Sequence, residues 1–200
     1  KRAKELGQSA VAITDHGAMY GVIEFYKEAL KEGVKPLIGC EMYVAPRTRF
    51  DKEFKIDGKR NHLVLICKNN EGYRNLIKMV SLSFTEGFYI KPRIDKDLIK
   101  QYHNGLICLS GCVSGEVAKL ALSNNIEAAT EVAKFYHEIF KDDYYIELQE
   151  HGTEESKFVN SNLIKIAKAE NIKVVATNDV HYVYKEDIKM HKVMLCLQTN

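Results

Sequence analysis

The sequence lacks several features that would point to a specialised class of protein. None of its apolar runs approaches the length of a membrane span, and no secretory signal peptide is visible. The net charge is only +2, so the chain is not a polybasic arm, and any contact with nucleic acid must use a local patch. We find no internal repeat, low-complexity segment or linker. These absences leave a folded domain that does not enter a membrane.

The cysteines also form no recognisable motif. No two of them make a Cys-x-x-Cys pair, and four lie in apolar runs or at the ends of such runs. An odd number of cysteines without a secretory signal indicates a reducing compartment, so we expect a cytoplasmic protein. The five are Cys40, Cys67, Cys108, Cys112 and Cys196.

Apolar residues are abundant enough to fill the core of one domain. They make up 46% of the 200 residues, and charged residues make up 28%. Apolar runs typical of strands alternate with segments of helical spacing, which implies an α/β fold with parallel strands and right-handed crossovers. We expect strands near residues 11–13, 36–45, 63–67, 105–112, 144–149 and 173–176.

Both ends of the sequence suggest a longer protein. Residues 1–7 have the pattern of a helix end closed by glycine, and no Met precedes them. The last predicted helix, near residues 185–197, is apolar at its end. We therefore expect further chain before Lys1 and after Asn200.

Two predicted strands end in polar residues that can bind metals. Asp15 and His16 follow the first apolar run, and Asp179 and His181 follow the last. Because the carboxyl ends of parallel strands gather on one side of a sheet, we expect these side chains to lie close together. Asp179 and His181 are two residues apart, so both can point to one centre from an extended segment.

Three further residues fit the same chemistry. Glu41 is a lone carboxylate inside an apolar strand, and Cys112 follows another strand. His62 begins its strand, so that strand either runs antiparallel or reaches the site differently. His, Asp, Glu and Cys bind zinc, manganese and iron. Several such metals together can lower the pKa of a bound water and stabilise both oxygens of a phosphoryl displacement.

Each of these residues also has an ordinary structural explanation. Asp-His-Gly after a strand is most often a turn with a helix cap. Glu41 can be a paired carboxylate on an edge strand, His62 can cap a loop, and Cys112 can be a small buried residue. Asp179 can cap the last helix. The gathering of His and Asp at two strand ends favours a shared metal site.

Several motifs resemble those of the polymerase and histidinol phosphatase (PHP) domain, in the form found in bacterial replicative DNA polymerase III alpha subunits. The similarity covers essentially residues 1–200. The motifs are Thr14-Asp15-His16-Gly17, Gly39-Cys40-Glu41, Asn61-His62-Leu63, Leu109-Ser110-Gly111-Cys112 and Asn178-Asp179-Val180-His181-Tyr182.

The resemblance implies a PHP-type distorted (β/α)7 barrel that holds up to three divalent metals, zinc or manganese. Asp15 would orient His16, and Asn178 would stabilise its turn. Glu41, Asp179 and His181 would be catalytic, with the two carboxylates bridging metals. Lys91 and Arg93 are weaker candidates for phosphate contacts, since surface charge explains them equally well. The implied metal ligands are His16, Glu41, His62, Cys112, Asp179 and His181.

The family's site also contains a His-x-His pair and a further Asp in its first strand and the loop after it. These would lie before Lys1, so we expect an incomplete barrel without its first strand, and an inactive isolated chain. A polymerase body would follow residue 200 and would carry the nucleotide-transfer site.

The resemblance leaves three functions open. The first is a metal-dependent 3′→5′ exonuclease within a DNA polymerase, acting on the primer terminus beside other replisome subunits. The second is a non-catalytic module that braces the polymerase or docks another subunit. The third is a stand-alone phosphoesterase similar to histidinol phosphatase.

Overall fold

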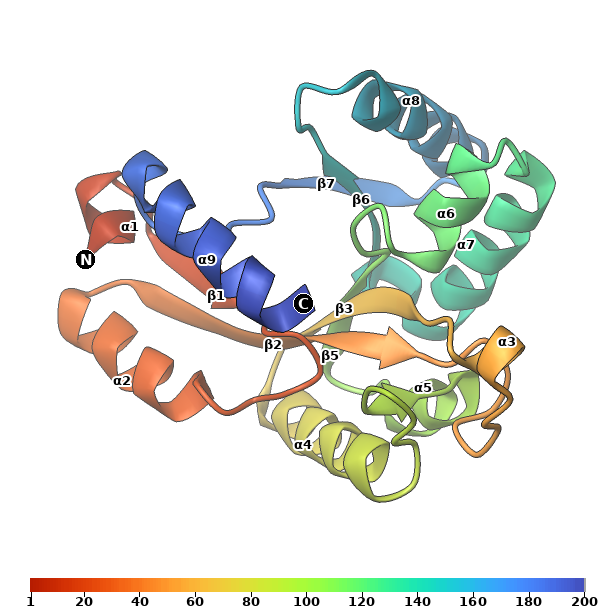
Figure 1. Ribbon diagram of the computed structural model, residues 1–200, viewed down its shortest axis with the longest axis horizontal. Coiled ribbons are helices and arrows are strands. Elements are labelled where there is room, and N and C mark those ends of the chain that lie inside the picture. The colour runs from red at the N-terminus through yellow and green to blue at the C-terminus, as the bar shows by residue number, and fades with distance from the viewer. Residues whose placement is uncertain (200) are drawn as a thin grey trace.

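The computed structural model describes residues 1–199, and their side chains up to residue 197. One curled sheet forms the centre of the molecule (Figure 1), in the order β1-β2-β3-β5-β6-β7, with β4 paired to β2. The strands are β1 (Ala10–Ile13), β2 (Lys35–Val44), β3 (Asn61–Cys67), β4 (Arg93–Ile94), β5 (Leu106–Leu109), β6 (Tyr144–Gln149) and β7 (Lys173–Thr177).

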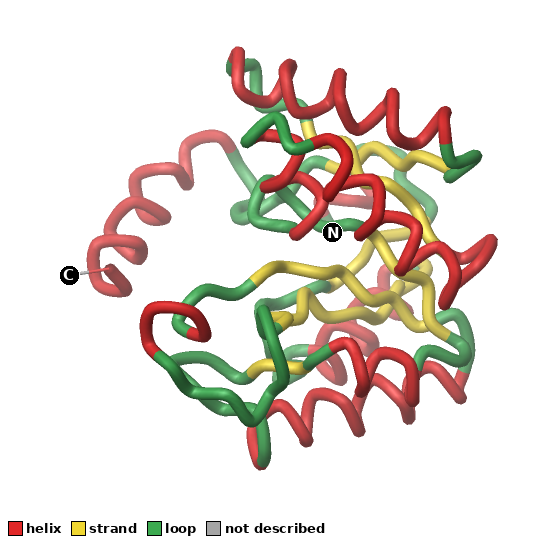
Figure 2. Tube along the Cα trace, turned by 90° about the vertical axis from the view of Figure 1, so that its right-hand side faces the viewer, coloured by secondary structure: helices red, strands yellow, loops and turns green. Residues whose placement is uncertain are grey.

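Helices cover the sheet in two layers, with the strands between them (Figure 2). The last helix projects from one side of this body in the second view (Figure 2). The helices are α1 (Arg2–Glu5), α2 (Val22–Glu32), α3 (Phe54–Asp57), α4 (Asn70–Thr85), α5 (Lys96–Tyr102), α6 (Glu116–Leu122), α7 (Ile126–Phe140), α8 (Glu154–Ala169) and α9 (Ile188–Thr199), with short 3-10 helices η1 (Lys141–Asp143) and η2 (Lys185–Asp187). None of the helices in this described part of the chain is long and apolar enough to cross a membrane.

The sheet is mixed, which corrects the expectation of purely parallel strands. β1 and β4 pair in parallel with β2, and β5, β6 and β7 are parallel to one another. β3 is antiparallel to both β2 and β5. The connection from β2 to β3 contains only the short α3, not a full crossover helix, so the chain returns in the opposite direction. This confirms the antiparallel alternative for the strand that begins at His62.

The sheet is an open half-barrel with β1 and β7 at its edges, and within residues 1–199 these two strands do not pair with each other. This arrangement agrees with the predicted incomplete barrel. The core packs between the sheet and the helices, where Met42, Leu65 and Ile146 from the strands meet Leu76 and Leu163 from α4 and α8. The core therefore fixes the strands whose ends carry the predicted ligands.

Candidate metal centre

Glu41 lies at the middle of the site and His16 is held beside it by backbone hydrogen bonds. Glu41 is on β2 and is only 6% exposed. Its N–H donates to the carbonyl of Asp15 over 3.0 Å, and its carbonyl accepts from the N–H of Gly17 over 2.8 Å. The segment after β1 thus continues along β2. Nδ1 of His16 consequently lies 3.2 Å from Oε2 of Glu41.

The glycine after His16 is required by this packing. Gly17 has φ +65°, a conformation that favours glycine. A Cβ at this position would lie 3.0 Å from the ring of Tyr43 and 3.1 Å from Cγ of Pro92. The Asp-His-Gly sequence is therefore a tight turn that presents the imidazole to β2.

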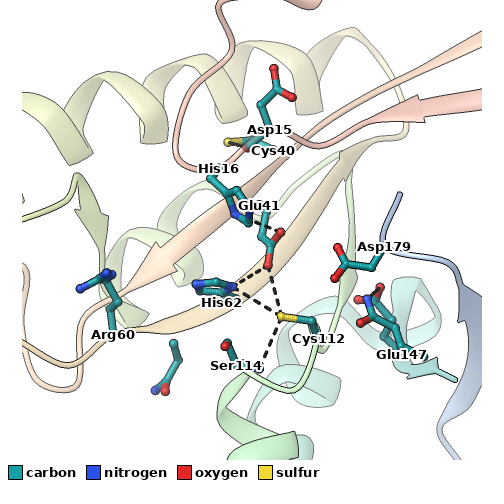
Figure 3. A network of polar contacts seen from close by, with 12 residues as sticks. Asp15, His16, Cys40, Glu41, Arg60, His62, Cys112, Ser114, Glu147 and Asp179 are labelled. Carbon is teal, nitrogen blue, oxygen red and sulfur yellow. Dashed lines mark hydrogen bonds and ion pairs between the residues drawn. The ribbon is translucent and has the colours of Figure 1, made fainter. Parts of the chain in front are cut away.

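His62 reaches the same carboxylate from the antiparallel strand. Glu41 is opposite Val64 in the register of β2 and β3, and His62 is two residues from Val64 on the same face. Nδ1 of His62 lies 2.7 Å from Oε1 of Glu41. The ligand atoms of His16, Glu41 and His62 all lie within 4.8 Å of one another, which makes them a group that can hold a cation (Figure 3).

Cys112 brings a sulfur to this group from the loop after β5. Its Sγ is 3.6 Å from Oε1 of Glu41 and 3.5 Å from Nδ1 of His62, and it accepts the N–H of Ser114 over 3.4 Å. The loop packs directly on β3, because a Cβ on Gly111 (φ +86°) would lie 2.7 Å from the carbonyl oxygen of His62. The Gly-Cys pair thus sets the sulfur beside the imidazole.

Asp179 and His181 approach from the end of β7. The carboxylate of Asp179 points towards Cys112 (Figure 3). Asp179 has φ +50°, an unfavourable conformation for a residue other than glycine. The ring of His181 is 6.0 Å from that of His16 between centroids, and its Nδ1 is 2.8 Å from the carbonyl oxygen of Asp179. The two strand ends therefore meet, although these two residues lie outside the tight group of three.

The electrostatics suit cation binding. Burial raises the pKa of Glu41, but the hydrogen bond from His62 and the charges of His62 and His16 outweigh it, so its pKa falls below 4.5. Burial, with smaller contributions from Glu41 and Asp179, raises the pKa of the Cys112 thiol to about 11. Glu41 is therefore ionised, and a bound cation would favour the thiolate of Cys112. Imidazole, carboxylate and thiolate together are a donor set for divalent transition metals.

Of the two residues expected to support the ligands, Asp15 lies differently. The carboxylate of Asp15 points away from His16 (Figure 3), towards Gly21 at the start of α2. Its side chain therefore does not orient His16, and only its carbonyl takes part, through the hydrogen bond from Glu41. Asn178 is exposed between β7 and Asp179, and its stabilising role stays a prediction.

Arg93 is a structural residue and not a phosphate contact. It is fully buried, and its guanidinium donates to four carbonyl oxygens at 2.9–3.1 Å. Those carbonyls occupy four of its five N–H donors in a buried position, so the expectation from the sequence is wrong. Lys91 is half-buried beside Pro92, which packs against Gly17, so its phosphate role stays a prediction. The four acceptors belong to Arg49, Asp51, Asp57 and Gly87.

Glu147 on β6 is a site residue that the sequence did not single out. It is 4% exposed, and its Oε1 accepts from the hydroxyl of Thr177 and from Nε2 of Gln149. Burial above all, with the charges of Glu41 and Asp179, raises its pKa. A lone carboxylate inside an apolar strand is the same signal that pointed to Glu41. Applied to β6, it would have found Glu147.

Cationic side chains border the centre on the side of His62 and were also missed. Nζ of Lys119 donates to the carbonyl of Arg60 over 2.7 Å and to Oδ1 of Asn61 over 3.1 Å. The guanidinium carbon of Arg60 lies 5.4 Å from the ring centre of Tyr43. This local positive charge adjoins the metal-binding group in a chain whose net charge is only +2.

A further histidine lies close to His181. The ring of His191 on α9 is 5.6 Å from that of His181 and 5.3 Å from that of Tyr182, measured between centroids. Its position within a helical pattern gave no sign of this proximity, because the fold alone brings α9 alongside.

Comparisons with known proteins agree with this geometry. The PHP domain family model matches residues 1–151. DNA polymerase III alpha subunits from Treponema pallidum and Chlamydia pneumoniae are 45% and 43% identical, over 100% and 99% of this chain but only 17% and 18% of their own lengths. The relative from Thermus aquaticus is 44% identical over 95% of the chain and 16% of its length.

A solved structure shares the fold. It is a candidate metal-dependent phosphoesterase from Bifidobacterium adolescentis, with a TM-score of 0.50 and 12% identity, covering 98% of this chain and 88% of its own. At that identity the likeness concerns the fold alone. The family model and the relatives both cover the part of the chain from β1 to β6, which includes His16, Glu41, His62 and Cys112. The chain belongs to the PHP domain family, and it resembles that domain of DNA polymerase III alpha subunits along essentially its whole length.

Proposed function

We propose that this chain is the PHP domain of a bacterial replicative DNA polymerase and that it removes nucleotides from DNA 3′ ends as a metal-dependent exonuclease in the cytoplasm. The observation that carries the proposal is the convergence of His16 and His62 on the two oxygens of Glu41, with Cys112 within 3.6 Å. The relatives' name supplies the context of a polymerase and of other replisome subunits.

Zinc or manganese, up to three ions, would be held by the six predicted ligands, which include the carboxylates of Glu41 and Asp179. Such ions supply an activated water and stabilise charge on the attacking and leaving oxygens. The negative charge of the ionised Glu41 would attract the cations to the centre. The hydrogen bond from Nδ1 of His181 to the carbonyl of Asp179 leaves Nε2 free to bind an ion. The full ligand set is His16, Glu41, His62, Cys112, Asp179 and His181.

DNA would approach over the cationic border. Arg60 and Lys119 lie next to His62 and Cys112, and Lys91 lies beside the loop that carries His16. Their positive charges would attract the backbone phosphates and offset the acidic ligands. Arg60 and Lys119 thus join Lys91 in the phosphate contacts that the sequence suggested for Lys91 and Arg93.

The test is nucleotide release from a mismatched primer by the full-length protein, since the isolated chain is expected to be inactive. We expect release that depends on added Mn²⁺ or Zn²⁺ and that falls to background in Asp179→Ala and His181→Ala. Asp142→Ala is the matched control. Asp142 is exposed on η1, which precedes the start of β6, and so lies at the end of the strand away from the metal centre. Unchanged release in both site variants would refute the assignment.

The second candidate is a module that docks against another protein surface, with metal needed only for stability. The apolar surface of α9 favours it, since Met190, Val193 and Leu197 are 70%, 58% and 75% exposed. In that case a chelator lowers the melting temperature of the full-length protein while no preparation releases nucleotides. A free-standing phosphoesterase has less support, because the chain spans only 16–18% of the length of the relatives it matches.

A further inference from the structure

A cavity of about 220 Å³ lies beside the metal centre, where the loop after β5 meets α6 and α8. Cys112 and Glu147 line it, together with the apolar side chains of Ala118, Val159 and Leu163. Cys112 belongs to both places, since its Sγ also lies 3.5 Å from Nδ1 of His62. Only the side chain of Cys112 therefore needs to separate a ligand in this cavity from the metal centre.

One oxygen of Glu147 in the cavity wall has no hydrogen-bond partner among the described residues. Oε1 accepts from Thr177 and Gln149, but Oε2 is buried and unpaired. Buried carboxyl oxygens are nearly always paired with protein, water or ligand. The unpaired oxygen, in a side chain that is 4% exposed, therefore marks a place where a ligand can complete the hydrogen bonding.

The charges around the cavity disfavour an anion, since the carboxylates of Glu147 and Glu155 line it and His151 is the one basic side chain among its lining residues. The start of α8, where an anion would otherwise bind, already has acceptors of its own: Oγ1 of Thr153 accepts the N–H of Ser156, and Oε1 of Glu150 accepts from the N–H of Gly152 and from Oγ of Ser156. A neutral group that carries N–H donors suits these acceptors, and the apolar residues suit a flat ring.

The size of the cavity limits the ligand to one ring system. Pockets for whole drug-sized ligands enclose roughly 300–1,000 Å³, and this one is smaller. We propose that it is the subsite for the nucleobase of the terminal nucleotide, with Oε2 of Glu147 accepting an N–H of the base. This rests on the proposed function, because a terminal phosphate at the metal centre places the attached sugar and base beside it.

The test compares two ligands on the Mn²⁺-loaded full-length protein by calorimetry. Deoxyadenosine 5′-monophosphate carries the base, and deoxyribose 5-phosphate lacks it. Val159→Phe fills the cavity, and Ile164→Phe, on the exposed side of the same helix, is the control. We expect Val159→Phe to weaken binding of the monophosphate by at least about tenfold, and binding of the sugar phosphate by less than about twofold.

A second variant guards against misfolding. Ser156→Phe fills the cavity from a half-buried position, where a larger side chain is tolerated more easily than in the core. Monophosphate affinities equal to the wild type in both variants would mean that the cavity holds water only, and would overturn the proposal. Because only this cavity is altered, the difference in monophosphate affinity between the variants and the wild type reports on this cavity and not on any other nucleotide site in the protein.

The two proposals fail separately. If the wild type releases no nucleotides but Val159→Phe still loses monophosphate affinity, the exonuclease is refuted and the nucleobase subsite stands. If the wild type releases nucleotides and both filling variants keep their affinity and their KM for primer, the subsite is refuted and the exonuclease stands.

Discussion

Nδ1 of His62 lies 2.7 Å from Oε1 of Glu41, although the two residues are on strands that run in opposite directions. The reversal of β3 brings its first residues to the side where the parallel strands β1, β5 and β7 end. An antiparallel strand can thus supply a ligand from its beginning to a site otherwise built from strand ends. The candidate centre depends on this contact more than on any other.

Removing Glu41 should abolish metal binding. We expect Glu41→Gln to lower metal affinity by more than the roughly 10–100-fold that the loss of a supporting residue causes, because His16 and His62 both face its carboxylate. Metal content after dialysis, measured by mass spectrometry, checks this. Glu116→Gln is the control, since that carboxylate pairs with Lys96 away from the centre. Equal metal content in wild type and Glu41→Gln would contradict the site.

Asp179 should show separable roles for its backbone and its carboxylate. Its φ of +50° is tolerated better by Asn than by Ala. Asp179→Ala should therefore lower the free energy of unfolding by about 1 kcal/mol relative to Asp179→Asn, while both lose metal. Urea unfolding without metal provides the measurement. Equal stability of the two variants would show that the left-handed conformation is not imposed by the fold.

Glu147 should make the protein less stable as the pH rises. Burial raises the pKa of Glu147 above 4.5, so the folded state holds this proton more tightly than the unfolded state. Its contribution to stability is full below the unfolded pKa and is lost as the pH rises through the folded pKa. Glu147→Gln removes that loss, because an amide stays neutral.

In metal-free protein, therefore, Glu147→Gln should be more stable than wild type at about pH 7.5, and the difference should shrink towards pH 4.5. Thermal unfolding across this range checks the sign. A variant that is less stable at pH 7.5 and gains nothing relative to wild type as the pH rises would mean that the pKa is not raised.

Arg93 and Lys91 should respond in opposite ways to the same substitution. Arg93→Met leaves four carbonyls without their donor, two of them in fully buried hydrogen bonds, so the free energy of unfolding should fall by about 3 kcal/mol or more. Lys91→Met should leave stability nearly unchanged and raise KM for primer, most strongly at low salt. Denaturant unfolding and primer kinetics separate the two. A stable Arg93→Met with raised KM would restore it as a phosphate contact.

The sequence predicted the strands because the signals were local. The apolar runs around Glu41 and before Asp179 correspond to β2 and β7. The fold brings His16, Glu41 and His62 together, and their role as ligands stays a prediction. The direction of β3 was left open, because the spacing of apolar residues does not encode strand direction. Only the short connection through α3 decides it.

The errors concerned residues whose surroundings come from distant parts of the chain. Arg93 reads as a surface charge after Pro92, yet its carbonyl partners lie up to 44 residues away. The sequence placed the Asp15 side chain beside His16, but consecutive residues of the extended segment that pairs with β2 point to opposite sides. Such contacts follow from tertiary packing and leave no periodic pattern in the sequence.

Anomalous diffraction from crystals of the full-length protein grown with Mn²⁺ tests the account most directly. We predict at least one peak bound jointly by Glu41 and His62, and a neighbouring peak towards Asp179 and His181. Metal bound elsewhere on the protein, with the Glu41 carboxylate still paired only to imidazoles at saturating Mn²⁺, would contradict it.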